Sequence, residues 1–274
     1  MIPPAELAGR AISRLQEIES RASSGSPFTS DLSPDELVLM EDAGFEPLHL
    51  VMGSSIYHIG FQWAAWNESR ELDVLTRAMY EARRQAMGRL EAEAAALGAH
   101  GVVGVRIEID HERWGHGLAE FLVLGTAVRA RAGDYRVTAA QRPFTSDLGG
   151  QDFYTLWRAG YRPLGLVMGN CVYHVARQGL GAVLGRMGQN VELPNFTEAM
   201  YASRESAMKR MQDEAARLGA EGIVGVRIEQ NAYLWGGHTM EFSALGTAVA
   251  PRPGGPAAPR PALRVPLEDA PPKA

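Results

Sequence analysis

The stretch that decides the fold runs from Leu97 to Glu108, with the sequence LGAHGVVGVRIE, and it returns as LGAEGIVGVRIE from Leu218 to Glu229. A glycine after a helix-forming run ends the helix, and the β-branched residues that follow are typical of a strand. Each occurrence therefore predicts a helix that stops at Gly98 or Gly219 and leads into a strand. Two occurrences in one chain predict two domains of one fold.

The repetition extends through most of the chain. Pro27–Leu32 recurs letter for letter as Pro143–Leu148, and Val51-Met52-Gly53 recurs as Val167-Met168-Gly169. The first part of each repeat aligns at an offset of about 116 residues and the later part at about 121, so the second repeat holds about five extra residues. We place these extra residues in a glycine-rich loop between the two parts.

Each repeat predicts the order helix, strand, helix, strand, strand over about 100 residues. In the first repeat, Ser33-Pro34-Asp35-Glu36 is a capping box with proline at the first helical position, and the short helix that it starts stops at Gly44. Phe28–Asp31 is expected to be a short extended piece. The longer elements are expected at residues 46–59 (strand), 71–97 (helix), 101–109 and 120–128 (an antiparallel pair of strands).

The fold class is therefore α+β, with two tandem two-layer domains in which a long helix covers a small, mainly antiparallel sheet. We expect a helix and linker at residues 1–26, the first repeat at 27–130, a linker at 131–142, the second repeat at 143–250 and a disordered tail rich in proline and alanine at 251–274.

Composition narrows the class of protein. The 274 residues are 46% hydrophobic and 22% charged, with a formal net charge of −5, which argues against a nucleic-acid-binding surface. Cys171 is the single cysteine, so the chain forms no internal disulfide. No run approaches the roughly 18 apolar residues that cross a bilayer. We expect a cytoplasmic protein without membrane insertion.

Histidines are the candidate metal ligands. His58 and His174 occupy equivalent strand positions, each after a tyrosine, while His111 and His116 flank the first hairpin and His238 lies in the second. Neither His58 nor His174 has a second ligand at metal-binding spacing, although a symmetry axis would gather several copies. A histidine hydrogen-bonded in a sheet or interface is the simpler interpretation of both.

A repeated set of charged residues is the candidate interface. It comprises Arg106, Glu108 and Glu120, which recur as Arg227, Glu229 and Glu241. We interpret the set as an ion-pair network on a sheet face or at a subunit interface, with an acid–base site as the less favoured alternative. Gly104 and Gly225 lie inside strands, where a glycine marks a bulge or a close approach of two backbones.

The motifs around the long helix and the following strand resemble the YbjQ-like family, described as "putative heavy-metal-binding domain". The residues that carry the resemblance are Ala82-Arg83, Gly88-Arg89-Leu90, Glu93-Ala94, Leu97-Gly98-Ala99, Gly101–Val105 and Gly125–Val128, with matching residues up to Gly246–Val249 in the second repeat. The resemblance implies a small α/β subunit that assembles as a ring, pentameric in known members. It implies little about activity.

These observations favour a non-enzymatic protein whose partner is a second copy of itself. Because five is odd, paired domains do not fill one five-membered ring with whole chains. Either five chains stack two rings, or three chains form a pseudo-sixfold ring. The alternative function is that of a metal-binding or metal-sensing protein, for which a divalent or soft metal ion would be the cofactor. An enzyme that uses Arg106, Glu108 and Glu120 ranks last.

Overall fold

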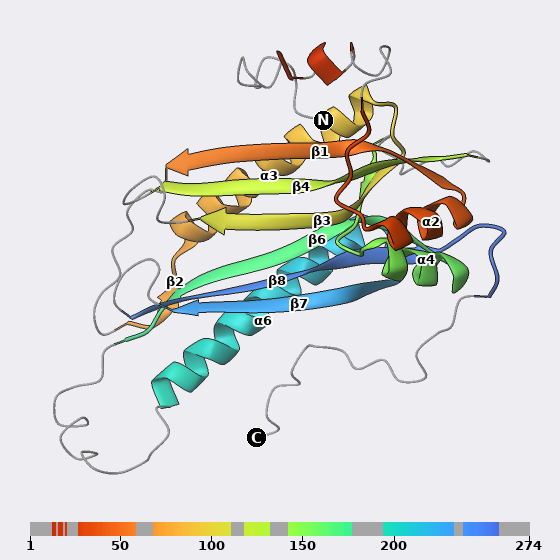
Figure 1. Ribbon diagram of the computed structural model, residues 1–274. Helices are drawn as coiled ribbons and strands as arrows, with labels where there is room; N and C mark the ends of the chain where they lie inside the picture. The colour runs from red at the N-terminus through yellow and green to blue at the C-terminus, as the bar shows by residue number, and fades with distance from the viewer. Residues whose placement is uncertain are drawn as a thin grey trace.

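The computed structural model describes residues 13–14, 16–18, 20, 27–58, 68–110, 118–131, 142–176, 194–232 and 238–257. Within these ranges each repeat contains the predicted order of helix, strand, helix, strand and strand, and the two repeats align in these five elements (Figure 1). Each repeat also has one further strand of two residues, at a different place in the order. The elements of the first repeat are α2 (Pro34–Asp42), β1 (Phe45–His58), β2 (Arg70–Glu71), α3 (Asp73–Ala96), β3 (Gly101–Asp110) and β4 (Leu118–Ala130). Those of the second are β5 (Phe144–Thr145), α4 (Gly150–Arg158), β6 (Tyr161–His174), α6 (Pro194–Arg217), β7 (Gly222–Ala232) and β8 (Thr239–Pro251).

The short helix α2 begins where the capping box predicts. The Ser33 hydroxyl accepts the Glu36 backbone N–H at 3.3 Å, and the Glu36 carboxylate accepts the Ser33 N–H at 2.9 Å. These two bonds satisfy backbone donors that the first turn of a helix leaves without partners. The chain then reverses at Gly44, whose φ of +84° suits a residue without a side chain.

Each sheet contains four strands, and each borrows an edge strand from the other repeat. The order in the first sheet is β1-β4-β3-β5, and in the second it is β2-β6-β8-β7. Strand β5 of the second repeat pairs in parallel with β3, while β2 of the first repeat pairs antiparallel with β6. The sequence predicts the antiparallel pairs β3–β4 and β7–β8 and contains no signal for this exchange of edge strands.

Helix α3 packs against two sheets. One face covers its own β1, and another lies along β6 of the second repeat, so a single hydrophobic core includes Val51 and Met79 from the first repeat and Leu166 and Val172 from the second. A second cluster joins the repeats through α2, the start of β1 and α4, where Phe45 of β1 meets Phe153 and Trp157 of α4 edge-on, with ring centroids 5.0 Å apart in each pair. The two repeats therefore form one packed unit.

The described part of the chain contains no helix that is long and apolar enough to cross a membrane. The predicted N-terminal helix is described at 13–14, 16–18 and 20, where the residues are helical. Most of the linkers, the hairpin turns at 111–117 and 233–237, and the tail beyond 257 lie outside the described residues.

The contact between helix and strand in each repeat depends on one glycine. A Cβ at Gly53 would overlap the carbonyl oxygen of Ala86 in α3, and a Cβ at Gly169 would overlap that of Ala207 in α6. The repeated motif Val-Met-Gly thus lets a helix approach its strand backbone closely.

We predict that Gly53→Ala destabilises the protein by about 3 kcal/mol, because the added methyl group must push α3 away from β1. Urea unfolding followed by circular dichroism measures the change. The control is Ser54→Ala on the same strand, where the side chain is exposed, with a change below about 0.5 kcal/mol expected. A neutral Gly53→Ala would contradict the close approach.

Candidate functional site

Two identical leader segments, residues 27–32 and 143–148, are each held on the sheet of their own repeat. In the second leader the hydroxyls of Ser146 and Thr247 are hydrogen-bonded at 3.0 Å, and the Asp147 N–H donates to the same threonine at 3.1 Å. Asp147 also pairs with Arg227 at 3.1 Å. This network holds the second leader in one conformation on its sheet.

The first leader repeats the same network. Ser30 and Thr126 are hydrogen-bonded at 3.0 Å, and the Asp31 N–H donates to Thr126 at 3.1 Å. Asp31 is also the ion-pair partner of Arg106. The network thus explains why the repeated leaders contain serine followed by aspartate.

The second leader also adds to the sheet of the first repeat. Its Ser146 N–H donates to Val102 O at 2.9 Å, and its Ser146 carbonyl accepts the Val105 N–H at 2.9 Å. The Gly104 N–H donates to Leu148 O at 2.9 Å. Gly101 makes room for the leader, because a Cβ there would overlap the Phe144 ring. Side chains hold the leader on its own domain, and its backbone pairs with the neighbouring domain.

Three polar side chains on one face of α3 bind the backbone of β6. The Val172 N–H donates to the Thr76 hydroxyl at 3.1 Å, and the Asn170 N–H donates to the Tyr80 hydroxyl at 2.9 Å. These bonds satisfy backbone groups along the edge of the second sheet, which β2 continues as a short strand. Burial raises the pKa of Tyr80, so the hydroxyl stays protonated.

Arg83 is the third of these side chains: it donates to the Leu166 carbonyl of β6 at 3.5 Å and pairs with Glu214 of α6. Its guanidinium donates to both carboxylate oxygens, at 3.0 and 3.1 Å, in the bidentate geometry that favours arginine over lysine. Glu214 in turn accepts the Met168 N–H at 2.8 Å. The equivalent carboxylate, Glu93, accepts the Met52 N–H at 2.9 Å.

Burial raises the pKa of Glu93, although the Met52 N–H and Arg14 lower it in part. Arg14 lies 3.5 Å from the Glu93 carboxylate. Glu93 is therefore a buried carboxylate, and Arg14, its cationic partner among the described residues, makes only a long contact with it.

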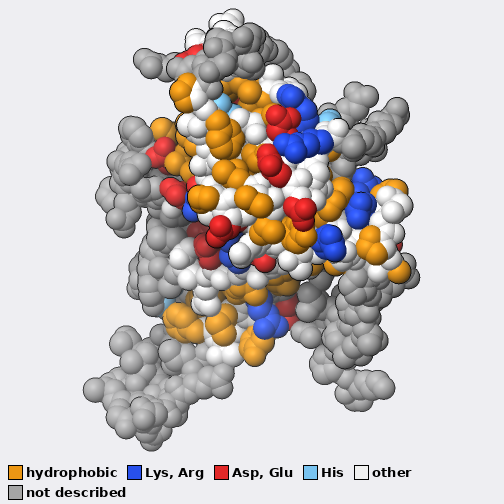
Figure 2. Space-filling view, turned by 45° about the vertical axis from the view of Figure 1, so that its right-hand side comes forward, with side chains coloured by type: hydrophobic (Ala, Val, Ile, Leu, Met, Phe, Trp, Pro, Cys, Tyr) orange, Lys and Arg blue, Asp and Glu red, His pale blue; other side chains and the backbone are white. Residues whose placement is uncertain are grey.

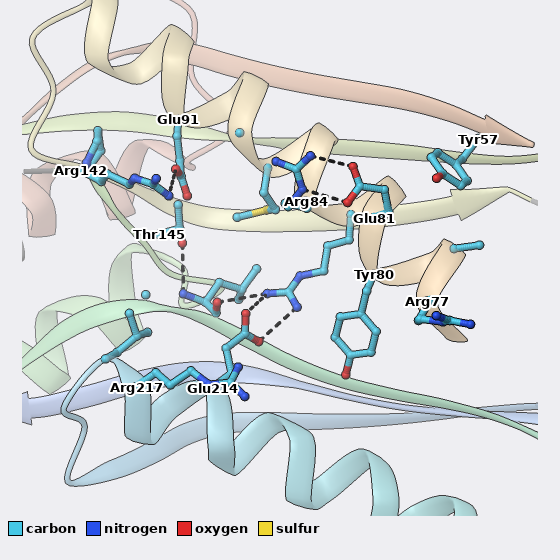
Figure 3. Close-up of a pocket in the computed structure, with 18 of the residues that line it drawn as sticks. Tyr57, Arg77, Tyr80, Glu81, Arg84, Glu91, Arg142, Thr145, Glu214 and Arg217 are labelled. Atoms are coloured by element: carbon cyan, nitrogen blue, oxygen red, sulfur yellow. Dashed lines mark hydrogen bonds and ion pairs between the residues drawn. The ribbon is translucent and has the colours of Figure 1, made fainter. Parts of the chain in front are cut away.

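A cavity of about 1280 Å³ lies beside this contact, lined by α3, β6 and α6 (Figure 3). Arginines and glutamates pair along its wall: Arg84 meets Glu81 at 2.7 Å, and Arg142 meets Glu91 at 3.9 Å. Burial raises the pKa of Glu91. The described lining contains no serine, cysteine or lysine, and the Thr145 hydroxyl already accepts the Leu166 N–H at 3.0 Å. This chemistry is typical of a contact surface between domains.

Within the described residues, the structure does not gather the predicted histidine ligands into one site. His58 and His174 end equivalent strands, and His58 is exposed. His238 has a φ of +66° and its ring centroid lies 6.2 Å from that of Phe196, while His111 and His116 lie outside the described residues. In the described part of the chain, no three histidine, cysteine, aspartate or glutamate side chains come together as metal ligands. A metal site therefore does not fit these residues of a single chain.

The repeated charged residues serve different contacts. Arg106 binds Asp31, while Glu120 lies opposite Asp110 in the β3–β4 pair. Glu241 is buried and accepts the Asn170 side-chain amide at 2.7 Å. Glu108 and Glu229 are exposed.

Gly104 and Gly225 have φ near +65° where the strand register shifts, which is the geometry of a bulge. Cys171 is buried, and burial raises the pKa of its thiol to about 12.

The sequence analysis did not identify Thr76, Tyr80, Arg83 and Glu214 as residues of one contact. The signal was present, because Tyr80 and Arg83 recur as Tyr201 and Arg204 on one face of the second long helix, at helical spacing. Polar residues repeated on the face of a helix that does not meet its own sheet indicate a second contact.

The family described as "Putative heavy-metal-binding", of YbjQ type, matches residues 69–131 and 161–252. The chain is 51% identical over 224 residues to a protein of Mycobacterium tuberculosis called "Encapsulin nanocompartment protein", which covers 81% of this chain and 85% of that protein. It is 37% identical over 99 residues to a UPF0145 protein of Thermus thermophilus, covering 34% of this chain and 83% of that protein. A UPF0145 protein of Methanococcus maripaludis is 50% identical over 58 residues, and the match covers 21% of this chain and 50% of that protein.

We predict that Arg83→Ala lowers the free energy of unfolding by about 2–3 kcal/mol, because it leaves a half-buried carboxylate without its bidentate partner. The matched control is Arg204→Ala at the equivalent position, where the side chain is exposed and a change below about 0.5 kcal/mol is expected. Urea unfolding in dilute solution measures both. Equal effects would show that Arg83 does not join the repeats.

Proposed function

Because the chain belongs to the YbjQ-type family and carries two family domains in tandem, we propose that it is a cytoplasmic, non-enzymatic protein that assembles with itself into a symmetric ring. One observation carries the proposal. The equivalent strand is covered on both faces in the second repeat and on one face in the first. Met168 of β6 is 3% exposed, and its counterpart Met52 of β1 is 45% exposed.

The helices show the complementary difference. Twelve of the 24 residues of α3 are buried, against five of the 24 residues of α6. Tyr201, the counterpart of Tyr80, is 48% exposed, and the Arg204 guanidinium lies 5.0 Å from its ring centroid. The chain therefore presents both halves of its own interdomain contact: a helix face on α6 and a strand edge on β1.

Apolar side chains also reach the surface over much of the face drawn in Figure 2, among scattered arginines and acidic side chains. Exposed patches of this kind mark interaction surfaces. The exposed large hydrophobic residues include Phe28, Met52, Ile56, Met200, Tyr201, Val226 and Ile228. Several of their counterparts in the other repeat are buried, which supports a second copy of this chain as the partner.

A contact between two different surfaces repeats head to tail, and it closes into a ring when the rotation permits. In such a ring α6 of one chain covers β1 of the next, and Arg204 pairs with Glu93 as Arg83 pairs with Glu214. Replacing Arg14 by Arg204 as the ion-pair partner of Glu93 would cost little free energy, because the distance of 3.5 Å between Arg14 and Glu93 is long and Arg14 is partly exposed. The two domains of a chain are then neighbours in one ring. This arrangement favours a pseudo-sixfold ring of three chains rather than two stacked rings formed by five chains. A relative named for a nanocompartment supports self-assembly.

We predict that native mass spectrometry and light scattering find an oligomer of the 29.7 kDa chain. Arg204→Glu is expected to weaken association by about 30-fold or more, because it places two carboxylates together at the centre of the contact. The control is Glu205→Lys on the same helix, whose counterpart Arg84 stays 55% exposed, and its association should be unchanged. A wild-type chain that is monomeric at every concentration would refute the proposal.

Metal binding is the second candidate, favoured by the description of the family. Because the described residues of one chain form no ligand group, a metal site would be formed by His58 or His174 with its symmetry mates in the ring, or at the hairpin turns that hold His111 and His116 outside the described residues. We expect untagged protein to retain no zinc or copper after gel filtration, measured by mass spectrometry of the metal. Retained metal that is lost in the double variant His58→Ala, His174→Ala would instead establish a metal-binding function.

A further inference from the structure

The first leader is held ready to pair with a strand. Its Ser30 and Asp31 make the same bonds to Thr126 that Ser146 and Asp147 make to Thr247, with matching distances. In the second repeat this conformation places the leader backbone against β3. The first leader is bonded to its own β1, where the Leu50 N–H donates to the Thr29 carbonyl at 2.8 Å, and within the described residues it joins no strand of another repeat. Phe28 is 48% exposed, whereas its counterpart Phe144 is 1% exposed.

The receiving strand is β7. It ends the second sheet, whereas its counterpart β3 is followed by β5. Val226 and Ile228 on β7 are 40% and 53% exposed, while Val105, the counterpart of Val226, is fully buried. An open edge strand with exposed apolar side chains is a template for pairing, and folded proteins usually cover such an edge.

The position that receives the phenylalanine ring is open. In the first sheet a Cβ at Gly101 would overlap Phe144, whereas a Cβ at the equivalent Gly222 would meet only Val249 Cγ2, at 3.8 Å. The space that Phe144 fills beside Gly101 is therefore unfilled beside Gly222. Phe28 has the matching ring and is exposed.

We propose that residues 27–32 of one chain add as a parallel strand to β7 of a second copy, with Phe28 seated over Gly222. This inference rests on the proposed self-assembly and names a contact separate from that of α6 on β1. By equivalence, Phe28 lies opposite Gly222 and Thr29 opposite Ile223. The Val226 N–H donates to the Ser30 carbonyl, and the Gly225 N–H donates to the Leu32 carbonyl.

The sequence of the leader identifies the occupant as this chain. Residues 27–32 and 143–148 are identical, and the receiving strands Gly101–Val105 and Gly222–Val226 differ at one position, valine against isoleucine. The glycine at φ near +65° that breaks the register of β3 beside the second leader is present in β7 as Gly225. Donor and acceptor therefore match a contact that already exists inside the chain.

A disulfide tests the register directly. In the double variant Phe28→Cys, Gly222→Cys the two cysteines are opposed on neighbouring strands, a separation that a disulfide spans. Mild oxidation should give covalent oligomers on non-reducing gels, with at least ten times more cross-linked chain than either single variant. The buried Cys171 is common to all of them and serves as the background.

The outcomes separate this contact from assembly itself. Oligomers in solution that do not cross-link, although both single variants assemble normally, would overturn the leader contact and leave self-assembly standing. A monomeric wild-type chain would remove both. As a second measurement, Phe28→Asp should weaken association by about 30-fold or more without changing the urea midpoint of the dilute protein. Unchanged association in Phe28→Asp would also overturn the contact.

Discussion

Two faces of helix α3 are packed against other elements, and the sheet of its own repeat covers only one of them. Gly53 brings the helix against β1, and on its other side Thr76, Tyr80 and Arg83 point to backbone groups that only another domain provides. The polar side of an amphipathic helix usually faces water, whereas these side chains of α3 bind the backbone of a second sheet. The second repeat supplies β6 for this purpose, and the rest of the molecule follows from that contact.

The consequence appears in α6, which has the same design and lacks the second sheet. Its Tyr201 and Arg204 are exposed, and it buries fewer residues than α3 although both helices have 24. Two equivalent helices of similar sequence thus have different environments in one chain. An interface that joins unlike surfaces leaves one copy of each surface uncovered at the two ends of an open series, and only closure into a ring covers both.

Much of the fold could be predicted from local sequence. The capping box at Ser33, the stop at Gly98 and the antiparallel pair β3–β4 all follow from short-range chemistry, and the structure confirms them. The exchange of β2 and β5 could not be predicted, because the choice between two nearly identical sheets depends on which domain lies closer in space. The polar face of α3 was predictable in principle, since Tyr80 and Arg83 recur at the same spacing as Tyr201 and Arg204. The different contacts of the repeated charged residues could not be predicted, because Arg106 binds Asp31 in a leader 75 residues away in the sequence.

The exact identity of the two leaders has a physical reason. Most repeated segments tolerate drift, because a side chain that packs on one neighbour can change when that neighbour changes. The second leader satisfies two partners: its serine and aspartate side chains bind their own threonine and arginine, while its phenylalanine ring and backbone fit beside a glycine of the other domain. In the proposed contact the first leader satisfies the same two kinds of partner. A change that suits one partner disturbs the other, so few sequences satisfy both. If the first leader served its own sheet alone, its exposed Phe28 would face water and nothing in its fold would require an aromatic ring there. The repeated phenylalanine is explained by a neighbour of the same sequence.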